Sequence, residues 1–379
     1  MSDAIRPFTV EISPDAVTDL RVRLARTRWP NPEPVADWSQ GLPLAYAMEL
    51  CHYWQTEYDF AAASQRLNTF PQFLTEIDGL DVHFLHVRSP EPSAFPLVLT
   101  HGWPGSIVEF LNVLKPLTDP AAHGGDPADA FDVVCPSLPG YGWSGKPAEA
   151  GWGVDRIAQA WIALMARLGY DRYGAQGGDW GSMVTASVGR QDPGHVAGIH
   201  LNMPVARPDQ DTFGDLTAFE QQTLADMARH REQGTGYSKQ QATRPQTLGY
   251  GLADSPAGQC AWIVEKFHEW TDCDGHPENA VARDALLDNV MVYWLTNSGA
   301  SSARLYWESF TRGNMDEISV PMGASIFPRE IVRMSQRWAS KRFTDIRYWN
   351  ELDRGGHFAA LEQPETFVNE VRSFFRLVR

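Results

Sequence analysis

The sequence predicts an α/β protein with a mostly parallel central sheet, helices on both faces, a helical lid inserted between two strands and a helical N-terminal segment. Short apolar runs at 95–100 and 132–136 are typical of strands buried within a parallel sheet. Helical stretches such as 154–168 alternate with these runs, which indicates helices packed on the sheet. The stretch 205–314 interrupts the alternation with helix-like sequence rich in Gln, Trp and Tyr.

The N-terminal segment, residues 1–80, is predicted to be helical. Ser13 suits an N-cap and Pro14 suits the first helical position, ahead of an amphipathic stretch at 16–26. A second helical region is expected at 42–67, where aromatic side chains offer packing surface.

The α/β core is expected to occupy 81–204 and 315–379. In a doubly wound sheet, an insertion between strands lies over their carboxyl ends, where ligands bind. The stretch 205–314 is therefore interpreted as a lid. Strands of the core are expected at 81–87, 95–100, 132–136, 172–176, 196–201, 322–327 and 345–349.

Composition narrows the class of protein. A net charge of -15 argues against a nucleic-acid partner, because neutralising phosphates needs clustered Lys and Arg. The four cysteines are far apart and form no C-x-x-C pair, so neither a disulfide framework nor a zinc site is expected. Reduced thiols fit a cytoplasmic protein. The start of the chain has no apolar signal region and no stretch of about 18 apolar residues occurs, so a soluble protein without a membrane partner is expected.

The strongest functional motif is GGDWG at 177–181, which follows a candidate strand and precedes a helix-compatible run. That is the setting of a nucleophile elbow, a strained turn that exposes its central residue at the edge of the sheet. The central residue here is Asp179. An ionised carboxylate is nucleophilic without an activating base, and the N-terminus of the following helix favours the ionised form. The alternative is a glycine-rich turn in which Asp179 only caps the helix.

The second motif is HGWPGS at 101–106, directly after the strand at 95–100. In this type of fold that loop donates one backbone N–H to an oxyanion hole, and the residue after the nucleophile donates another. Trp103 and Trp180 would be these donors. The Trp103–Pro104 bond is a candidate cis bond, because such bonds occur in tight functional turns. The alternative is an ordinary turn that ends a strand.

The third motif is RGGHF at 354–358, where His357 stands on a glycine loop near the end of the chain. The order nucleophile, acid, histidine is that of the α/β-hydrolase fold. Glu330 follows the strand at 322–327 and lies between Asp179 and His357 in sequence, so it is the expected acid. Asp353 is a rival, but a residue four positions before His357 is poorly placed to reach its imidazole.

Together these motifs resemble the epoxide hydrolases of the microsomal type. The resemblance extends over nearly the whole chain, including the N-terminal stretch from Phe8 to Pro30 and the tryptophans Trp38 and Trp54. The matching motifs are HGWPGS (101–106), LPGYGWS (138–144), GGDWGS (177–182), QATRPQT (241–247) and RGGHFAA (354–360).

The resemblance also implies that two lid tyrosines hold the epoxide oxygen. The first matches Tyr237, just before the QATRPQT motif, and the second matches Tyr306. Tyr250 and Tyr293 lie in the same lid and are interpreted as packing residues. By base rate, any lid tyrosine is more often a half-buried aromatic than a functional group. Membrane-bound members of the family carry an apolar N-terminal anchor that this sequence lacks, so membrane localisation does not carry over.

The predicted activity is hydrolysis of an epoxide to a vicinal diol, with no metal and no organic cofactor. Asp179 would attack a ring carbon while Tyr237 and Tyr306 support the departing oxygen, since a phenol with a pKa of about 10 can donate to an alkoxide. His357, oriented by Glu330, would then activate water against the resulting ester.

Some predictions stay open at this level. The 14 tryptophans suit a hydrophobic or aromatic substrate, although core packing explains most of them equally well. The sequence leaves the oligomeric state open, with a homodimer as one candidate. The main alternative is a haloalkane dehalogenase, which uses the same Asp, His and acid but needs halide-binding N–H donors, for which Trp103 and Trp180 are candidates. A third alternative is a non-catalytic relative that only binds a ligand under the lid.

Overall fold

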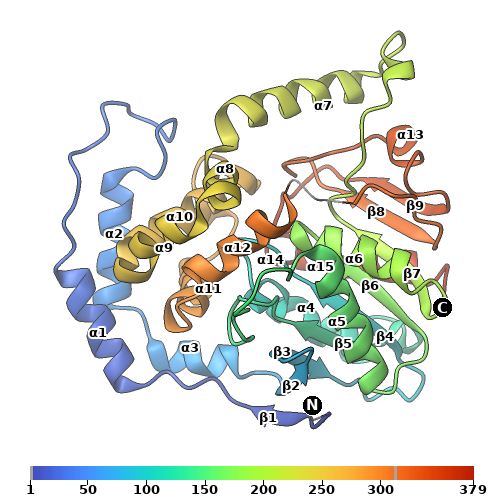
Figure 1. Ribbon diagram of the computed structural model, residues 1–379, viewed down its shortest axis with the longest axis horizontal. Coiled ribbons are helices and arrows are strands. Elements are labelled where there is room, and N and C mark those ends of the chain that lie inside the picture. Colours follow the sequence, from blue (N-terminus) through green and yellow to red (C-terminus); the bar gives the residue numbers. More distant parts are fainter. Residues whose placement is uncertain (1–2, 311–313) are drawn as a thin grey trace.

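The computed structural model describes residues 3–310 and 314–379, and within them nine strands form one sheet in the order β1-β2-β3-β5-β4-β6-β7-β8-β9 (Figure 1). From β5 to β9 every neighbouring pair is parallel. The predicted fold class, a mostly parallel sheet with helices, is confirmed. The strands are β1 (Arg6–Phe8), β2 (Gln72–Ile77), β3 (Leu80–Val87), β4 (Phe95–Thr100), β5 (Phe131–Pro136), β6 (Tyr173–Gly177), β7 (Val196–Leu201), β8 (Met322–Ile326) and β9 (Ile346–Glu351).

Both faces of the parallel sheet are covered. Along β4, Val98 belongs to the apolar cluster on one face, whereas Leu97 and Leu99 belong to the cluster on the other. This follows from the period of two in a strand. One face carries α5 (Val154–Arg167) and α6 (Trp180–Gln191), and the other carries α4 (Leu111–Thr118), α14 (Ala359–Glu362) and α15 (Pro364–Phe375).

The N-terminal segment is less uniformly helical than the sequence analysis predicts. It contains β1 and β2, which extend the sheet on its antiparallel side next to β3. The turn between β2 and β3 is Asp78-Gly79, and both residues have positive φ, 52° and 75°. Asp-Gly is a strong two-residue hairpin signal because glycine and aspartate tolerate this conformation. The signal was present in the sequence and identifies the hairpin that the helical interpretation missed.

The helices of this segment begin as predicted. Ser13 accepts a hydrogen bond from the Ala16 N–H, and Pro14 is the first residue of the first helix. The first two of these helices pack against a helix of the lid, α10. The segment therefore lies against the lid as well as the sheet, as Figure 1 shows. Its helices are α1 (Pro14–Ala25), α2 (Leu44–Thr56) and α3 (Phe60–Leu67).

The lid consists of helices placed between β7 and β8 in the chain. The predicted limits of this insertion, 205 and 314, and those of the other two regions stay predictions. None of the helices in 3–310 and 314–379 combines the length and apolar character needed to span a bilayer. The lid helices are α7 (Ala218–Arg229), α8 (Gly236–Thr243), α9 (Pro245–Asp254), α10 (Pro256–Trp270), α11 (Arg283–Leu295) and α12 (Gly299–Ser309).

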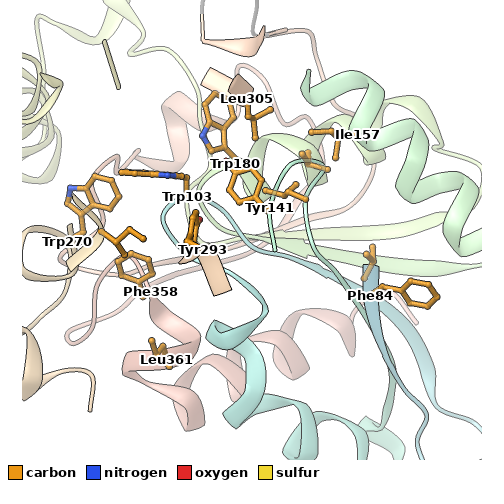
Figure 2. Close-up of a cluster of buried hydrophobic side chains, with 14 of the residues drawn as sticks. Phe84, Trp103, Tyr141, Ile157, Trp180, Trp270, Tyr293, Leu305, Phe358 and Leu361 are labelled. Carbon is orange, nitrogen blue, oxygen red and sulfur yellow. The ribbon is translucent and has the colours of Figure 1, made fainter. Parts of the chain in front are cut away.

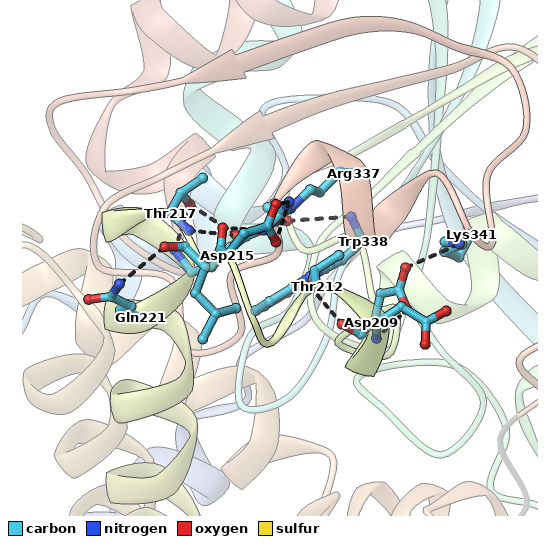
Figure 3. Close-up of polar contacts among 12 residues, drawn as sticks. Asp209, Thr212, Asp215, Thr217, Gln221, Arg337, Trp338 and Lys341 are labelled. Carbon is cyan, nitrogen blue, oxygen red and sulfur yellow. Dashed lines mark hydrogen bonds and ion pairs between the residues drawn. The ribbon is translucent and has the colours of Figure 1, made fainter.

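The chain entering the lid is tied to the core beside α13 (Gln336–Ala339), as Figure 3 shows. The buried Glu220 carboxylate pairs with Arg337 at 2.5 Å and accepts a hydrogen bond from Ser335 at 2.7 Å. The Trp338 indole N–H donates to the Thr212 hydroxyl at 2.8 Å. These polar contacts hold the first lid helix against the α/β core.

Candidate active site

Asp179 stands on a sharp turn between β6 and α6. Its φ of 51° and ψ of -129° lie outside the regions that non-glycine residues usually adopt. Steric crowding explains why glycine occupies two positions near Asp179. A Cβ on Gly177 would lie 2.2 Å from the Gly181 carbonyl oxygen, and a Cβ on Gly181 would lie 1.9 Å from the Thr100 carbonyl oxygen. The backbone therefore has the geometry of a nucleophile elbow.

The Asp179 carboxylate is only 8% exposed and meets two groups from other loops. Its Oδ1 accepts a hydrogen bond from the Trp103 backbone N–H at 2.8 Å. Its Oδ2 lies 3.4 Å from His357 Nε2. The Trp103–Pro104 bond is cis, as expected. Two of the three sequence motifs therefore converge on this one side chain.

His357 lies between two carboxylates. Its Nδ1 lies 2.5 Å from Glu330 Oε1, and its backbone N–H donates to the Trp270 carbonyl oxygen at 2.9 Å. Burial disfavours the imidazolium, but the charges of Glu330 and Asp179 outweigh burial and raise the pKa of His357 well above its ordinary value. The rival acid, Asp353, is exposed, and the Nδ1 bond of His357 goes to Glu330.

The two lid tyrosines face this group from α8 and α12. The rings of Tyr237 and Tyr306 are 5.8 Å apart between centroids. The Trp103 ring stacks on Tyr237 at 5.0 Å and meets Tyr306 edge-on at 5.9 Å. Burial raises the pKa of both phenols, and the negative charge of Asp179 adds to the rise. Two neutral phenols therefore lie within the electrostatic reach of the carboxylate.

The hydroxyl of Tyr306 is buried and makes no hydrogen bond of ordinary geometry among the described residues, although the Tyr237 and Trp180 side chains lie close enough to interact with it. Leaving such a group without a full hydrogen bond costs roughly 1–3 kcal/mol. The other lid tyrosines differ. Tyr250 is 70% exposed, and the Tyr293 hydroxyl donates to the Gly105 carbonyl oxygen at 2.7 Å.

Tryptophan rings wall the space around these groups. Figure 2 shows Trp103, Trp180 and Trp270 in one cluster of buried side chains. The Trp180 ring meets Tyr306 edge-on at 4.8 Å, and the Trp270 ring lies 5.2 Å from Tyr237. Trp180 is also the first residue of α6, where backbone N–H groups have no partner within the helix. Its N–H is therefore a second candidate donor beside Asp179.

Sequence reasoning missed three residues beside this site. The Trp270 ring lies 5.0 Å from that of His357, and its indole N–H is buried without a partner in the described chain. Burial raises the pKa of Glu109 to about 8, with His357 and Asp179 among the charges acting on it. Glu362 accepts the backbone N–H of Phe358 at 2.9 Å. Glu109 lies in the short helix Ile107–Phe110 that directly follows the HGWPGS motif, so its proximity to that motif was the available signal. No comparable signal lies near Trp270 in the sequence.

A cavity of about 1710 Å³ approaches the site from the lid side. It is bordered by the loop at Trp38, by α7 and by α10, and it reaches Tyr237 and Trp270. Within residues 3–310 and 314–379, no cluster of three His, Cys, Asp or Glu side chains is arranged to hold a metal ion. The four cysteines are buried and unpaired.

Comparisons with known families agree with this geometry. The family described as alpha/beta hydrolase fold matches residues 96–247, and the family described as epoxide hydrolase N terminus matches residues 5–110. The first match, together with the sheet and the elbow, defines the class as an α/β hydrolase. Individual relatives then identify the family within this class.

A protein from Stigmatella aurantiaca described as a candidate epoxide hydrolase is 52% identical over 379 residues, covering 99% of this chain and 86% of that protein. Epoxide hydrolase 1 of Oryctolagus cuniculus is 35% identical over 407 residues, covering 99% of this chain and 90% of that protein. The crystal structure of juvenile hormone epoxide hydrolase from Bombyx mori superposes with a TM-score of 0.91 at 30% identity, covering 99% of this chain and 95% of that one. The chain belongs to the epoxide hydrolase family, in agreement with the resemblance of its motifs to the microsomal type.

Proposed function

We propose that this chain hydrolyses an epoxide to a vicinal diol through a hydroxyalkyl ester of Asp179. One observation carries the proposal: a carboxylate on a strained elbow is held by a backbone N–H and a histidine, and two buried phenols face it from the lid. Membership of the epoxide hydrolase family supports the reaction class.

In the first step Asp179 attacks a ring carbon. The Trp103 N–H occupies Oδ1, so Oδ2, which lies 3.4 Å from His357 Nε2, is the oxygen that forms the new C–O bond. As the ring C–O bond breaks, the electron pair goes to the epoxide oxygen, and Tyr237 and Tyr306 stabilise that oxygen by hydrogen bonding and protonation. Burial of both phenols keeps them protonated, and therefore able to donate, across the neutral pH range.

In the second step water cleaves the ester. Before the first step the Asp179 carboxylate helps to hold a proton on His357. Esterification removes that negative charge, so the pKa of His357 falls and its proton passes to the phenolate left by the first step. The neutral imidazole then becomes a base for water. Glu330 keeps the ring oriented through Nδ1.

The hydroxide attacks the Asp179 carbonyl carbon, and the resulting oxyanion forms on the oxygen that the Trp103 N–H already contacts. The Trp180 N–H is the proposed second donor. Removing one oxyanion donor typically costs roughly 3–4 kcal/mol of the barrier. Collapse of the intermediate breaks the bond to the alkoxide, which takes the proton held by His357 and leaves as the diol. The Asp179 carboxyl then gives its proton to His357, which restores the carboxylate.

The lining of the site favours a hydrophobic or aromatic epoxide. Trp103, Trp180 and Trp270 present ring faces and edges around the phenols, and such surfaces bind apolar groups with offset or edge-on contacts. The cavity of about 1710 Å³ reaches Tyr237 and Trp270 but is lined mostly by polar and charged side chains, so the proposed apolar preference rests on the tryptophan rings.

A second candidate function is haloalkane dehalogenation, favoured by the unpartnered, buried indole N–H of Trp270. An indole donor of this kind can stabilise a departing halide, and Asp179 would attack the carbon in the same way. The two phenols separate the alternatives, since a strained ether needs them and a halide does not.

The test measures diol formation from racemic styrene oxide and halide release from a set of 1-haloalkanes. The variants are Asp179→Ala and the double variant Tyr237→Phe/Tyr306→Phe. Diol from the wild type alone, without halide release, supports the proposal. Halide release that survives loss of both phenols supports the dehalogenase. Binding of the epoxide without turnover by folded wild-type protein would instead support a ligand-binding relative.

A further inference from the structure

The loop that carries Trp103 is held by a lid helix, α11. The Asn289 side-chain amide donates to the Pro104 carbonyl oxygen at 2.7 Å, and the Tyr293 hydroxyl donates to the Gly105 carbonyl oxygen at 2.7 Å. The Ser106 hydroxyl donates to the side-chain amide oxygen (Oδ1) of Asn289, also at 2.7 Å. All three bonds are buried, so each is expected to hold its groups firmly.

These bonds fix the carbonyl groups of Pro104 and Gly105, the two residues that follow Trp103. Asn289 and Tyr293 are four residues apart, so a single face of α11 reaches both carbonyl oxygens. Neither side chain contacts Asp179 in the hydrogen-bond network, whereas the Trp103 N–H does. An oxyanion donor works only when it is already aimed at the place where charge develops. The two lid residues therefore act on the site through the loop.

The N-terminal segment in turn holds α11. The Arg66 guanidinium makes two hydrogen bonds to the Asp288 carboxylate, at 2.6 and 2.8 Å, and the Tyr58 hydroxyl donates to the same group at 2.5 Å. The Tyr53 hydroxyl donates to Asp284 at 2.7 Å. Asp284 and Asp288 are again four residues apart and form the neighbouring face of the helix. The bidentate Arg66 contact is the strongest type of side-chain pair.

We propose that α11 is the positioning element of the oxyanion loop: Asn289 and Tyr293 hold the carbonyl groups after Trp103, and Arg66 and Tyr58 hold α11 through its neighbouring face. The inference rests on the proposed function, because it concerns the donor that stabilises the intermediate formed on Asp179. It assigns the N-terminal segment, through its contacts with α11, a part in the chemistry of the core.

The proposal makes the two half-reactions respond differently. Ester formation needs Asp179 and the phenols, and the Trp103 N–H contributes there only by holding the carboxylate. Ester breakdown builds a full negative charge on the oxygen that the Trp103 N–H contacts. Loosening the loop should therefore slow breakdown by roughly 10- to 100-fold, less than the ~10²–10³-fold of losing the donor itself. Ester formation should change by less than about 3-fold, because only the carboxylate's orientation is affected.

The experiment is single-turnover mixing of enzyme with styrene oxide, quenched in acid, with the ester followed by intact-protein mass and the diol by chromatography. The variants are Asn289→Ala, Tyr293→Phe and Arg66→Met. Tyr293→Phe removes one oxygen atom and is the variant least able to disturb folding. Arg66→Met should shift breakdown in the same direction, by a smaller factor.

The matched controls lose a comparable hydrogen bond elsewhere. Asn68→Ala removes side-chain bonds with the Val10 N–H and carbonyl oxygen, at 2.8 and 2.9 Å, together with bonds to Ser64 and Gln72. Tyr173→Phe removes a hydroxyl bond to Asp192, 2.9 Å long. Thermal unfolding of every protein gives the stability cost, so that a general loss of stability is seen in both groups alike.

Accumulation of ester in the α11 variants and not in the controls, at similar melting temperatures, supports the proposal. Breakdown at the wild-type rate in Asn289→Ala and Tyr293→Phe, or an equal slowing of both half-reactions, overturns it. A wild-type protein that forms diol while no ester mass appears would contradict the proposed covalent mechanism, and with it this role for α11.

Discussion

The two sides of the site treat their polar groups in opposite ways. On the core side, Asp179, His357 and Glu330 form one chain of contacts at 2.5–3.4 Å, in which only the second oxygen of Glu330 is buried without a partner among the described residues. On the lid side, the Tyr306 hydroxyl and the Trp270 indole N–H are buried without partners in the described residues. A buried charge without a partner is far more costly than a buried neutral hydroxyl. Charges are therefore paired in advance, whereas neutral donors can be left open for the substrate.

The backbone shows the same contrast. Asp179 sits on a strained turn between a strand and a helix, while Tyr237 and Tyr306 lie within ordinary helices. Strain at the elbow is tolerated because the sheet and α6 hold it from both sides. The lid positions its donors by packing of aromatic rings instead. In the proposed mechanism, the core supplies the reactive groups in fixed positions, and the lid supplies the side chains that contact the substrate.

The comparison is tested most severely by His357→Gln. We expect turnover to fall by about 10⁴-fold, the scale seen when one member of a catalytic triad is removed. Ester formation on Asp179 should persist, because the carboxylate is nucleophilic without a base. Quenched-flow with intact-protein mass should therefore show full conversion of the protein to the ester.

Asp179→Asn is the control, since it leaves His357 in place but should form no ester. Loss of the ester signal in both variants would mean that His357 is needed for the first half-reaction, and the division between the two steps would be wrong.

A smaller effect is expected from Tyr306→Phe. Ester formation should slow by about 10²-fold, the lower range for loss of a positioned acid. Stability should rise or stay level, because the change removes a buried hydroxyl without a partner, which costs roughly 1–3 kcal/mol where it is unpaired. Denaturant midpoints and single-turnover rates measure the two effects on one sample.

Tyr58→Phe is the matched comparison, because its hydroxyl donates to the Asp288 carboxylate. That variant should lose about 1–3 kcal/mol of unfolding free energy, since it leaves a buried carboxylate short of a donor. If both Tyr→Phe changes destabilise equally, the Tyr306 hydroxyl is paired in solution and the contrast between the two sides of the site fails.

A further effect concerns Glu109 and appears only as a dependence of stability on pH. Its folded pKa of about 8 is above the ordinary value near 4.3, so the folded state holds a proton that the unfolded state releases. Stability from this group is full below about pH 4 and is lost as pH rises toward 8, at up to about 1.4 kcal/mol per pH unit. Glu109→Gln should remove this slope in urea titrations between pH 5 and 9.

Glu362 provides an internal reference, because burial raises its pKa to about 7. Glu362→Gln should flatten the pH dependence over a window that ends about one unit lower. An unchanged slope in Glu109→Gln would show that the Glu109 carboxyl is ionised and solvated at neutral pH.

Sequence alone determined the sheet of the core and the order of its chemical groups. Each of the motifs around Trp103, Asp179 and His357 is a local unit in which glycines, a strand before and a helix or loop after limit the backbone to few conformations. The Asp78-Gly79 hairpin belongs to the same kind of local signal, although the helical interpretation of the N-terminal segment passed over it. The tyrosines of the lid depended on family resemblance, because a helix with one tyrosine carries no local mark of function.

Only the tertiary structure decided which side chains surround these motifs. Trp270 reaches His357, and Asn289 reaches the loop after Trp103, across long separations in the chain. The residues next to Trp270 and Asn289 in the sequence do not predict these contacts, since helices pack through whichever faces their neighbours leave available. The contacts of α11 with both the N-terminal segment and the oxyanion loop follow from that packing. Short-range backbone constraints can be read from neighbouring residues, whereas contacts between distant residues exist only once the chain has folded.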